Sequence, residues 1–257
     1  MNRTQARVLL AAALMGGAVT SAPAWAQVTL KPDGQWRHAI GLGLSYASGN
    51  SESSTLTLNA DGVRQTGYDK WSYYGKALRA ESDDETTGDQ IGLGTRYERD
   101  INGRVFGFGQ ADYLRDRPAN LSRRGSVGGG LGYHVFKTDT LTWDVFGGVG
   151  YTHDRYIEPT DVGGATRTTW GYTDLLVGEE SNHQIRDSTT FRQRFVIYPN
   201  MSESGEFRAQ LDAGLSVAIN ERMSLTATQT YRYNSDPGAG FEKDDLLFVT
   251  GISAKIE

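Results

Sequence analysis

The sequence contains no cysteine, so no disulfide bond can stabilise the fold. Small secreted domains commonly depend on such bonds, and a chain without them needs another source of stability. Long apolar runs are also missing after residue 26, which excludes a membrane-spanning helix of about 20 residues from that part. The mean hydropathy of -0.49 is still compatible with a membrane barrel, because barrel strands direct only alternate side chains toward lipid.

Histidine is scarce, with four residues in the whole chain. His38, His134, His153 and His183 show none of the spacings at which metal ligands occur. The sequence also lacks a convincing serine and histidine pair, or a cluster of aspartate and histidine, for a barrel hydrolase. We therefore predict no catalytic residue, no cofactor-binding residue and no metal ligand, and a protein that is not an enzyme.

Two acidic segments leave two interpretations open. The stretch ESDDETTGD at 81–89 and the stretch EKDD at 242–245 are rich in carboxylates, which are ligands for Ca²⁺. Their spacing does not match an EF-hand, and acidic surface loops are ordinarily solvated. We favour solvated loops over an ion site.

The first 26 residues have the features of a secretory signal peptide. Two arginines precede an apolar run at 8–19, and the tripeptide AWA that ends at residue 26 provides a cleavage site. The apolar run is too short for a spanning helix. We predict a signal peptide at 1–26 and an outer-membrane barrel domain at 27–257.

Charge and aromatic content also limit the function. The chain has 31 acidic and 26 basic residues, and removal of the predicted signal takes away two arginines and no acid. This acidic balance argues against nucleic acid as a partner. The 13 tyrosines and 5 tryptophans are typical of the aromatic girdles of outer-membrane barrels.

The clearest pattern runs from Phe207 to Asn234, where residues alternate with period two on both sides of a turn at 220–222. One face carries Phe207, Ala209, Leu211, Ala213, Leu215, Val217 and Ile219 in the first arm, and Met223, Leu225, Ala227, Gln229, Tyr231 and Tyr233 in the second. Period two is typical of β-strands. Each arm matches the ~9–11 residues that a tilted strand needs to cross a bilayer. We predict a membrane-spanning hairpin here.

The same alternation recurs along the chain. It predicts strands at 36–47, 55–61, 71–80, 91–98, 105–114, 126–134, 141–151, in a segment ending near 177, and at 189–198 and 246–256. The register stays open for 71–80 and for the segment that ends near 177. A soluble β-sandwich is the rival architecture, but its strands would be shorter.

The connections between these strands predict an orientation. Short connections at 99–103, 137–140 and 220–222 alternate with longer ones at 81–89, 115–124, 153–167 and 235–243. Outer-membrane barrels have short periplasmic turns and longer extracellular loops. We predict an all-β fold, a transmembrane antiparallel up-and-down β-barrel of about 12 strands with both termini on the periplasmic side.

Several charged residues near the C-terminal end alternate onto the face opposite the apolar one. A charge that faces lipid costs ~2–4 kcal/mol at the bilayer midplane, so these side chains are expected to point inward. The predicted lumen-lining residues are Arg192, Arg194, Arg208, Asp212 and Arg232. They either line a pore or form arginine–aspartate pairs that plug the lumen, and both interpretations stay open.

Four segments carry a resemblance to a known family. They are GLGLSYASGNSESSTLTLNAD at 41–61, TTFRQRFVIYPN at 189–200, AGLSVAINERMSLTATQTYRYNSDPGAG at 213–240 and EKDDLLFVTGISAKI at 242–256. In this order and spacing they resemble the YdiY-like family of salt-induced outer-membrane proteins, which has a domain of unknown function. The likeness covers nearly all of the chain after the signal. It implies an outer-membrane β-barrel without an assigned activity, so no functional residue is transferred.

The expected location is the outer membrane of a Gram-negative cell. The expected partners are outer-membrane lipid and lipopolysaccharide, the barrel-assembly machinery, and ions or small solutes. A narrow passive pore is the leading function, because 12 strands lie between filled barrels of ~8 and open channels of ~16–18, and the inward arginines predict a preference for anions. The alternatives are a structural or envelope-stress barrel without transport and an outer-membrane hydrolase.

Overall fold

The computed structural model describes residues 31–47, 53–83, 85–238 and 241–256. The predicted signal peptide lies outside the described residues. All regular secondary structure in these four ranges is β-strand. No helix in them is long and apolar enough to cross a membrane.

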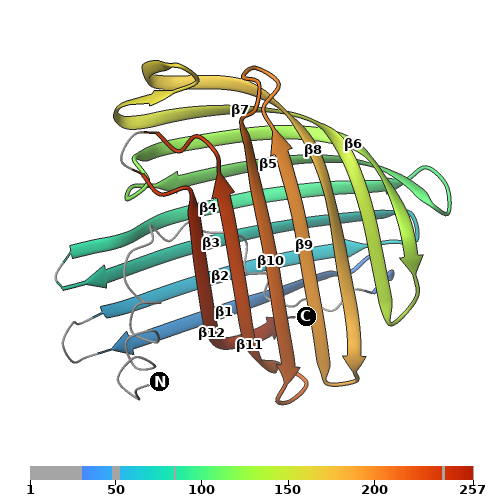
Figure 1. The fold of residues 1–257 in the computed structure, drawn as a ribbon. Helices are drawn as coiled ribbons and strands as arrows, with labels where there is room; N and C mark the ends of the chain where they lie inside the picture. Colours follow the sequence, from blue (N-terminus) through green and yellow to red (C-terminus); the bar gives the residue numbers. More distant parts are fainter. Residues whose placement is uncertain (1–30, 48–52, 84, 239–240, 257) are drawn as a thin grey trace, which may run out of the picture.

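Twelve strands follow one another in the described part of the chain (Figure 1). They are β1 (Trp36–Ala47), β2 (Ser53–Gln65), β3 (Asp69–Ser82), β4 (Glu85–Asp100), β5 (Val105–Asp116), β6 (Leu121–Lys137), β7 (Leu141–Val162), β8 (Ala165–Arg186), β9 (Thr189–Pro199), β10 (Phe207–Ala218), β11 (Met223–Asn234) and β12 (Asp244–Ile256). Each strand pairs with its neighbours in sequence, and β12 returns to pair antiparallel with β1, which closes the sheet. The structure confirms the predicted up-and-down β-barrel.

The two ends of the barrel differ in their connections. The end where β1 begins and β12 finishes carries the short connections 66–68, 101–104, 138–140, 187–188 and 219–222, and we call it the turn end. The opposite end, which we call the loop end, carries the connections 117–120, 163–164 and 200–206 and the described residues 235–238 and 241–243. Both termini of the barrel therefore lie at the turn end.

Three segments predicted as loops are largely strand. Strand pairing continues through most of 81–89 and into both ends of 115–124. The segment 153–167 belongs almost entirely to the β7–β8 hairpin, whose turn is Gly163-Gly164 with positive φ values of 55° and 71°. Strand β8 likewise continues to Arg186 and leaves only 187–188 as the turn to β9. Polar side chains do not interrupt the ladder hydrogen bonds of a strand, so polarity alone underestimated strand length.

The predicted alternation of faces is confirmed in the hairpin of β10 and β11. Leu215 and Leu225 are 39% and 53% exposed, whereas Ser216 and Ser224 are 5% and 1% exposed. The register that stayed open in β3 is settled by pairing with β2 and β4, which turns Trp71 outward and buries Lys76 inside. The outer surface is therefore apolar and the interior polar.

The wall formed by β6 and β7 curves strongly between its two ends (Figure 1). Glycines face the interior of this bend. A Cβ atom on Gly130 would lie 2.1 Å from the carbonyl oxygen of Gly147, and one on Gly148 would lie 2.3 Å from that of Gly129. The two strands approach closely here because neither position carries a side chain.

Candidate functional site

The interior of the barrel contains a charged group near the turn end, which we call the turn-end cluster. Its members are Lys70, Arg96, Glu98, Asp100, His134, Lys137 and Asp144. Glu98 accepts from Lys70 Nζ at 2.8 Å and from Arg96 Nε at 2.6 Å, and both its partners are largely buried. Lys70 belongs to β3, whereas Arg96 and Glu98 both belong to β4. The alternation of each strand directs these side chains inward.

The second part of this cluster is centred on His134 of β6. Its Nδ1 atom lies 2.6 Å from Asp144 Oδ1, and its Nε2 atom lies 3.1 Å from Asp100 Oδ1. Lys137 Nζ also binds Asp100, at 2.6 Å. The imidazole stacks on Phe106 with ring centroids 4.7 Å apart. Charged groups and an aromatic ring thus contact one another inside the barrel at this end.

An apolar group packs beside the cluster inside the barrel. It consists of Phe106, Phe108, Phe146, Leu176 and Val196. The guanidinium of Arg96 lies over the rings of Phe108 and Phe146, at 4.1 and 4.5 Å from their centroids. Arginine over an aromatic face gains cation–π attraction, so Arg96 joins the apolar group to Glu98 and narrows the lumen.

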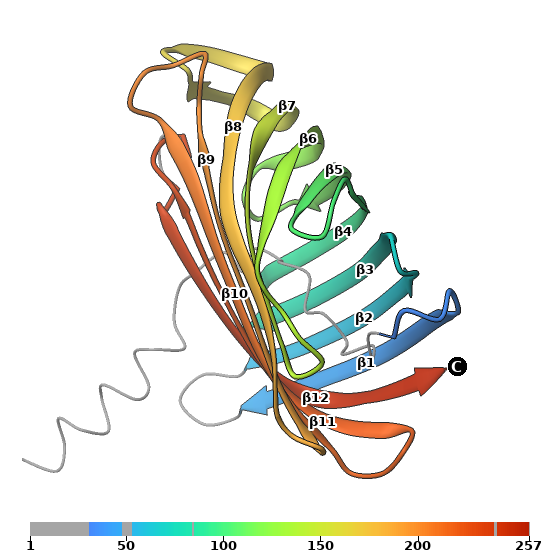
Figure 2. The ribbon, with the colours of Figure 1, turned by 90° about the vertical axis from the view of Figure 1, so that its right-hand side faces the viewer.

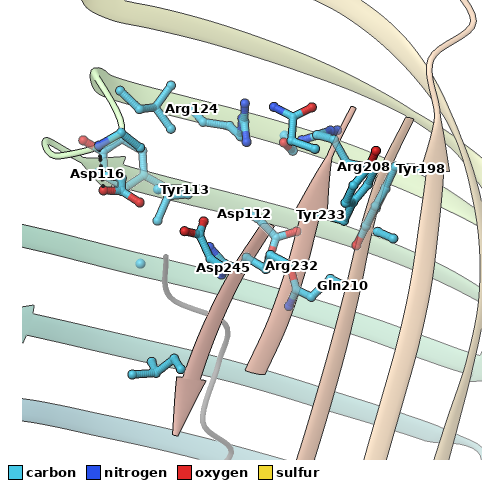
Figure 3. Close-up of a pocket in the computed structure, with 18 of the residues that line it drawn as sticks. Asp112, Tyr113, Asp116, Arg124, Tyr198, Arg208, Gln210, Arg232, Tyr233 and Asp245 are labelled. Carbon is cyan, nitrogen blue, oxygen red and sulfur yellow. Dashed lines mark hydrogen bonds between the residues drawn. The ribbon is translucent and has the colours of Figure 1, made fainter. Parts of the chain in front are cut away.

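A cavity of about 1450 Å³ occupies the interior toward the loop end. Its wall includes inward side chains of β3, β4, β5 and β6 on one side and of β10, β11 and β12 on the other (Figure 3). Eight acids line it, namely Glu81, Asp112, Asp116, Asp174, Asp236, Glu242, Asp244 and Asp245. Six bases line it, namely Arg96, Arg124, Arg194, Arg208, Arg232 and Lys243. The wall is highly charged and slightly acidic.

Three of the five residues predicted from the sequence contribute to this wall: Arg194, Arg208 and Arg232. Arg208 NH2 binds Asp174 Oδ2 at 2.7 Å, and its guanidinium lies between Tyr172 and Tyr198, at 5.2 and 5.3 Å from their ring centroids. Arg194 Nε lies 3.6 Å from Glu180 Oε2. Both arginines are therefore partly neutralised by acids that the alternation did not single out.

The remaining predicted residues, Arg192 and Asp212, are absent from the cavity wall formed by the described residues. Asp212 is 6% exposed and accepts from Gln210 Nε2 at 2.7 Å and from Thr230 Oγ1 at 3.1 Å. Arg192 also lies on the inner face of β9, where the charges of Glu180 and Asp61 act on it. The structure thus places these two residues on the inner face of the barrel, but not in the part of it that lines the cavity.

Arg232 differs from the other cavity arginines. In the described part of the chain it has no hydrogen bond or ion pair, and its buried Nε atom lacks a partner. The register places it opposite Asp245 of β12, and Figure 3 shows it between Asp245 and Gln210 in the cavity wall. Its guanidinium therefore lies in the cavity wall without a described acceptor.

Several charged wall residues were not predicted. Asp112 accepts from the Tyr74 hydroxyl at 2.8 Å, and Arg124 binds Asp154 through two contacts of 2.6 Å. The same alternation test applied to 91–98 marks Arg96 and Glu98 as inward. Asp154 was not identified from the sequence, because its segment was assigned to a loop.

The loop end of the cavity is bordered by the tip of the β7–β8 hairpin. Gly163 N donates to Asp236 Oδ2 at 3.1 Å, which ties the hairpin tip to the connection between β11 and β12. Beneath the tip, Leu121, Tyr156, Val162, Trp170 and Tyr172 form a second apolar cluster. No group of three or more His, Asp or Glu suited to a metal occurs among the residues that the structure describes.

The closed antiparallel sheet, with its apolar outside and charged inside, makes this protein an all-β up-and-down barrel. The family model described as "Protein of unknown function, DUF481" matches residues 40–255, and the chain belongs to that family. It is 25% identical over 198 residues to the uncharacterized protein YdiY of Escherichia coli (strain K12), covering 77% of this chain and 74% of that protein.

Solved barrels show a general likeness to this structure. The translocator domain of the autotransporter NalP from Neisseria meningitidis matches with a TM-score of 0.45 and 13% identity, over 86% of this chain and 87% of that one. The NanC porin matches with a TM-score of 0.44 and 10% identity, over 84% of this chain and 97% of that one. The KdgM porin matches with a TM-score of 0.44 and 8% identity, over 86% and 99%.

Proposed function

We propose that this protein spans the outer membrane and acts as a narrow, passive pore for ions or small solutes. The location is supported by outward apolar side chains around the barrel, among them Leu44, Leu131, Val177 and Leu225, all more than half exposed. In water such a belt would be an association hazard. In a bilayer it is the surface that lipid contacts.

The location is tested by reversing polarity on the two faces of one strand. Leu215→Arg places a charge in hydrocarbon, at a cost of ~2–4 kcal/mol near the midplane, and should sharply reduce insertion into lipid vesicles. Ser216→Ala alters the neighbouring inward position and serves as the matched control. Equal insertion of Leu215→Arg and the control would contradict the membrane location.

The pore is supported by one observation, the cavity of about 1450 Å³ with charged walls inside the barrel. Fixed charges in a low-dielectric wall select ions and hydrated solutes. The acids that face the arginines lower the anion preference expected from the arginines alone, so we expect weak ion selectivity. Arg96 over Phe108 and Phe146 narrows the path, and we expect a small conductance.

Conductance of the purified barrel in a planar bilayer tests the pore. Arg96→Ser removes the side chain that crosses toward the two phenylalanines and should raise the conductance. Arg79→Ser is the control, because Arg79 is outward and half exposed. No current from either the wild type or Arg96→Ser would overturn the pore.

The turn-end cluster favours a second candidate, a structural barrel without transport. Its carboxylates and cations are paired across β3, β4, β6 and β7, which is the arrangement expected of a permanent plug. A silent bilayer together with normal insertion supports this candidate.

A further inference from the structure

Two walls of the internal cavity face each other across the barrel. In the closed order of the strands β4 lies opposite β10, and Figure 2 shows β3 to β5 on one side and β9 and β10 on the other. Asp112 of β5 lines the cavity from the first wall, and Arg194 and Tyr198 of β9 line it from the second. The cavity therefore has an acid on one wall and a base on the other.

The position of Asp112 is fixed by the two strands beside it. The register places Tyr74 of β3, Gly94 of β4 and Asp112 next to one another. A Cβ atom on Gly94 would overlap the Tyr74 ring and lie 2.5 Å from Asp112 Oδ1. Because Gly94 has no side chain, the Tyr74 hydroxyl reaches over β4 and donates to Asp112 Oδ1 at 2.8 Å. Gln110 Nε2 donates to Asp112 Oδ2 over a longer 3.4 Å, which leaves this oxygen able to accept from a ligand.

Arg194 makes few contacts for a side chain that is only 11% exposed. Its Nε atom lies 3.6 Å from Glu180 Oε2 and is buried without a hydrogen-bond partner. Its guanidinium lies 5.5 Å from the centroid of the Phe146 ring. The Tyr198 hydroxyl also lacks a hydrogen bond within the described part of the chain. The second wall thus presents two groups whose donors are not used by the protein.

Asp112 and Arg194 influence each other across the cavity without forming an ion pair. The charge of each acts on the other, and both charges act on the Tyr198 hydroxyl. Among the described residues, the ion pair of Arg194 is with Glu180 and not with Asp112. Both side chains line the same cavity. A solute inside it can therefore contact the two opposite charges together.

The charge of the wall disfavours a solute of one sign. Arg208 and Arg96, the cations near this site, are each already paired with an acid, and the wall as a whole has eight acids and six bases. An anion would be repelled by Asp112, and a cation would be repelled by Arg194. Such repulsion is strong in a low-dielectric wall. A solute with one charge of each sign gains both attractions.

We propose that the cavity is a binding site for a small zwitterionic solute with one carboxylate and one ammonium group, the chemistry of an amino acid. The carboxylate accepts hydrogen bonds from Arg194 and from the Tyr198 hydroxyl, since a guanidinium matches a carboxylate in geometry. The ammonium group donates to Asp112. The site names the solute class of the proposed pore, and it rests on that pore for passage through the barrel but not for binding.

Binding to the purified full-length barrel in a neutral detergent, measured by isothermal titration calorimetry, tests the solute class. The probes are glycine, 4-aminobutyrate and 6-aminohexanoate, in which the two charges lie progressively farther apart. Each probe has two controls, the carboxylate and the amine of equal chain length, which carry one charge each. At least one probe should bind about tenfold more tightly than both of its controls. If no probe exceeds its controls, the proposal is overturned.

Two variants assign the charges of the site. Asp112→Asn keeps an oxygen for the Tyr74 hydroxyl but removes the charge, and it should weaken the bound probe about tenfold while the carboxylate control binds equally or more tightly. Arg194→Gln should weaken the probe to a similar extent, while the amine control binds equally or more tightly. A tenfold loss is ~1.4 kcal/mol, within the range for a hydrogen bond to a charged group. A general loss of structure would weaken all three compounds.

Glu85→Gln and Arg123→Gln are the matched controls, because both residues are exposed and lie outside the cavity wall. They should leave the affinities unchanged, and losses equal to those of Asp112→Asn and Arg194→Gln would overturn the site. Conductance of the same preparations separates the two proposals. A barrel that conducts but does not distinguish the probes from their controls contradicts the solute class alone. A barrel that binds a probe but carries no current supports the site and contradicts the pore.

Discussion

The two ends of the barrel interior differ in the space beside their charged side chains. Near the turn end, Glu98 has two cations within 2.8 Å and is largely buried with them. Near the loop end, Arg232 belongs to a wall that encloses about 1450 Å³ and makes no ion pair with a described residue. The cavity wall also contains ion pairs, Arg208 with Asp174 and Arg124 with Asp154, so Arg232 differs from its neighbours as well as from the turn-end cluster.

The difference follows from what surrounds each charge. Paired charges that are buried together hold their neighbours in place, because loss of one partner leaves the other uncompensated. A charge that faces a large cavity can exchange water for a ligand without losing a protein partner. We therefore expect variants near the turn end to change stability, and variants near the loop end to change binding or conductance.

The largest expected effect is at Glu98. Glu98→Ala leaves Lys70 and Arg96 buried without their shared carboxylate, which should cost ~3–5 kcal/mol of unfolding free energy. Glu81→Ala breaks a pair with Arg79 in which both side chains are about half exposed, and such pairs contribute ~0–1 kcal/mol. Urea unfolding from vesicles measures both. Similar losses would mean that the turn-end cluster is not specially stabilising.

A smaller loss is expected from crowding the bend of β6 and β7. Gly130→Ala forces a methyl group against the carbonyl oxygen of Gly147, and overpacking of this kind costs ~1–3 kcal/mol. Gly109→Ala is the control, because nothing lies within 4 Å of its Cβ position. The same unfolding experiment compares them, and an unchanged Gly130→Ala would show that the bend relaxes freely.

The smallest effect is expected at Glu206, in the connection between β9 and β10. Burial, aided by the charge of Asp236, raises the pKa of Glu206 above its ordinary value. The folded loop therefore binds the proton more readily than the unfolded chain, so its stability falls as pH rises through the raised pKa. Protection of amides 200–206 from hydrogen exchange should decrease over that range in the wild type.

Glu206→Gln is the matched variant for this test. It keeps the side-chain oxygen that accepts from Asn200 Nδ2 at 3.0 Å but removes the titrating proton. Protection of the loop should then stay constant across the same pH range. An identical pH profile in both proteins would assign the effect to another group.

The barrel itself was predictable because its strands alternate strictly between apolar outward and polar inward side chains. In β10 and β11 that rule placed Leu215 outside and Ser216 inside, as the structure has them. It failed where strands continue beyond the apolar belt, as in the β7–β8 hairpin. In that hairpin the strands are held by backbone hydrogen bonds, and the pattern of polar and apolar side chains does not reveal them.

The interior was predictable only in part. Alternation identifies which side of a strand Arg208 occupies, but its contact with Asp174 joins β10 to β8, and no local pattern encodes that distance. The pairing of β12 with β1 is also hidden, because these strands lie at opposite ends of the chain. The inward face of a strand follows from sequence, whereas membership of the cavity wall and partners across the barrel require the closed structure.

The glycines of the β6–β7 bend also limit which substitutions this chain tolerates. Outward positions such as Leu131 need only remain apolar, so many substitutions should be neutral there. At Gly130 and Gly148 a larger side chain would meet the neighbouring backbone and lower the stability of the barrel. A saturation library selected for folded barrel should therefore retain variety at outward sites and be strongly enriched in glycine at these two. Close backbone approach at the bend thus restricts the choice of residue more than the outer surface does.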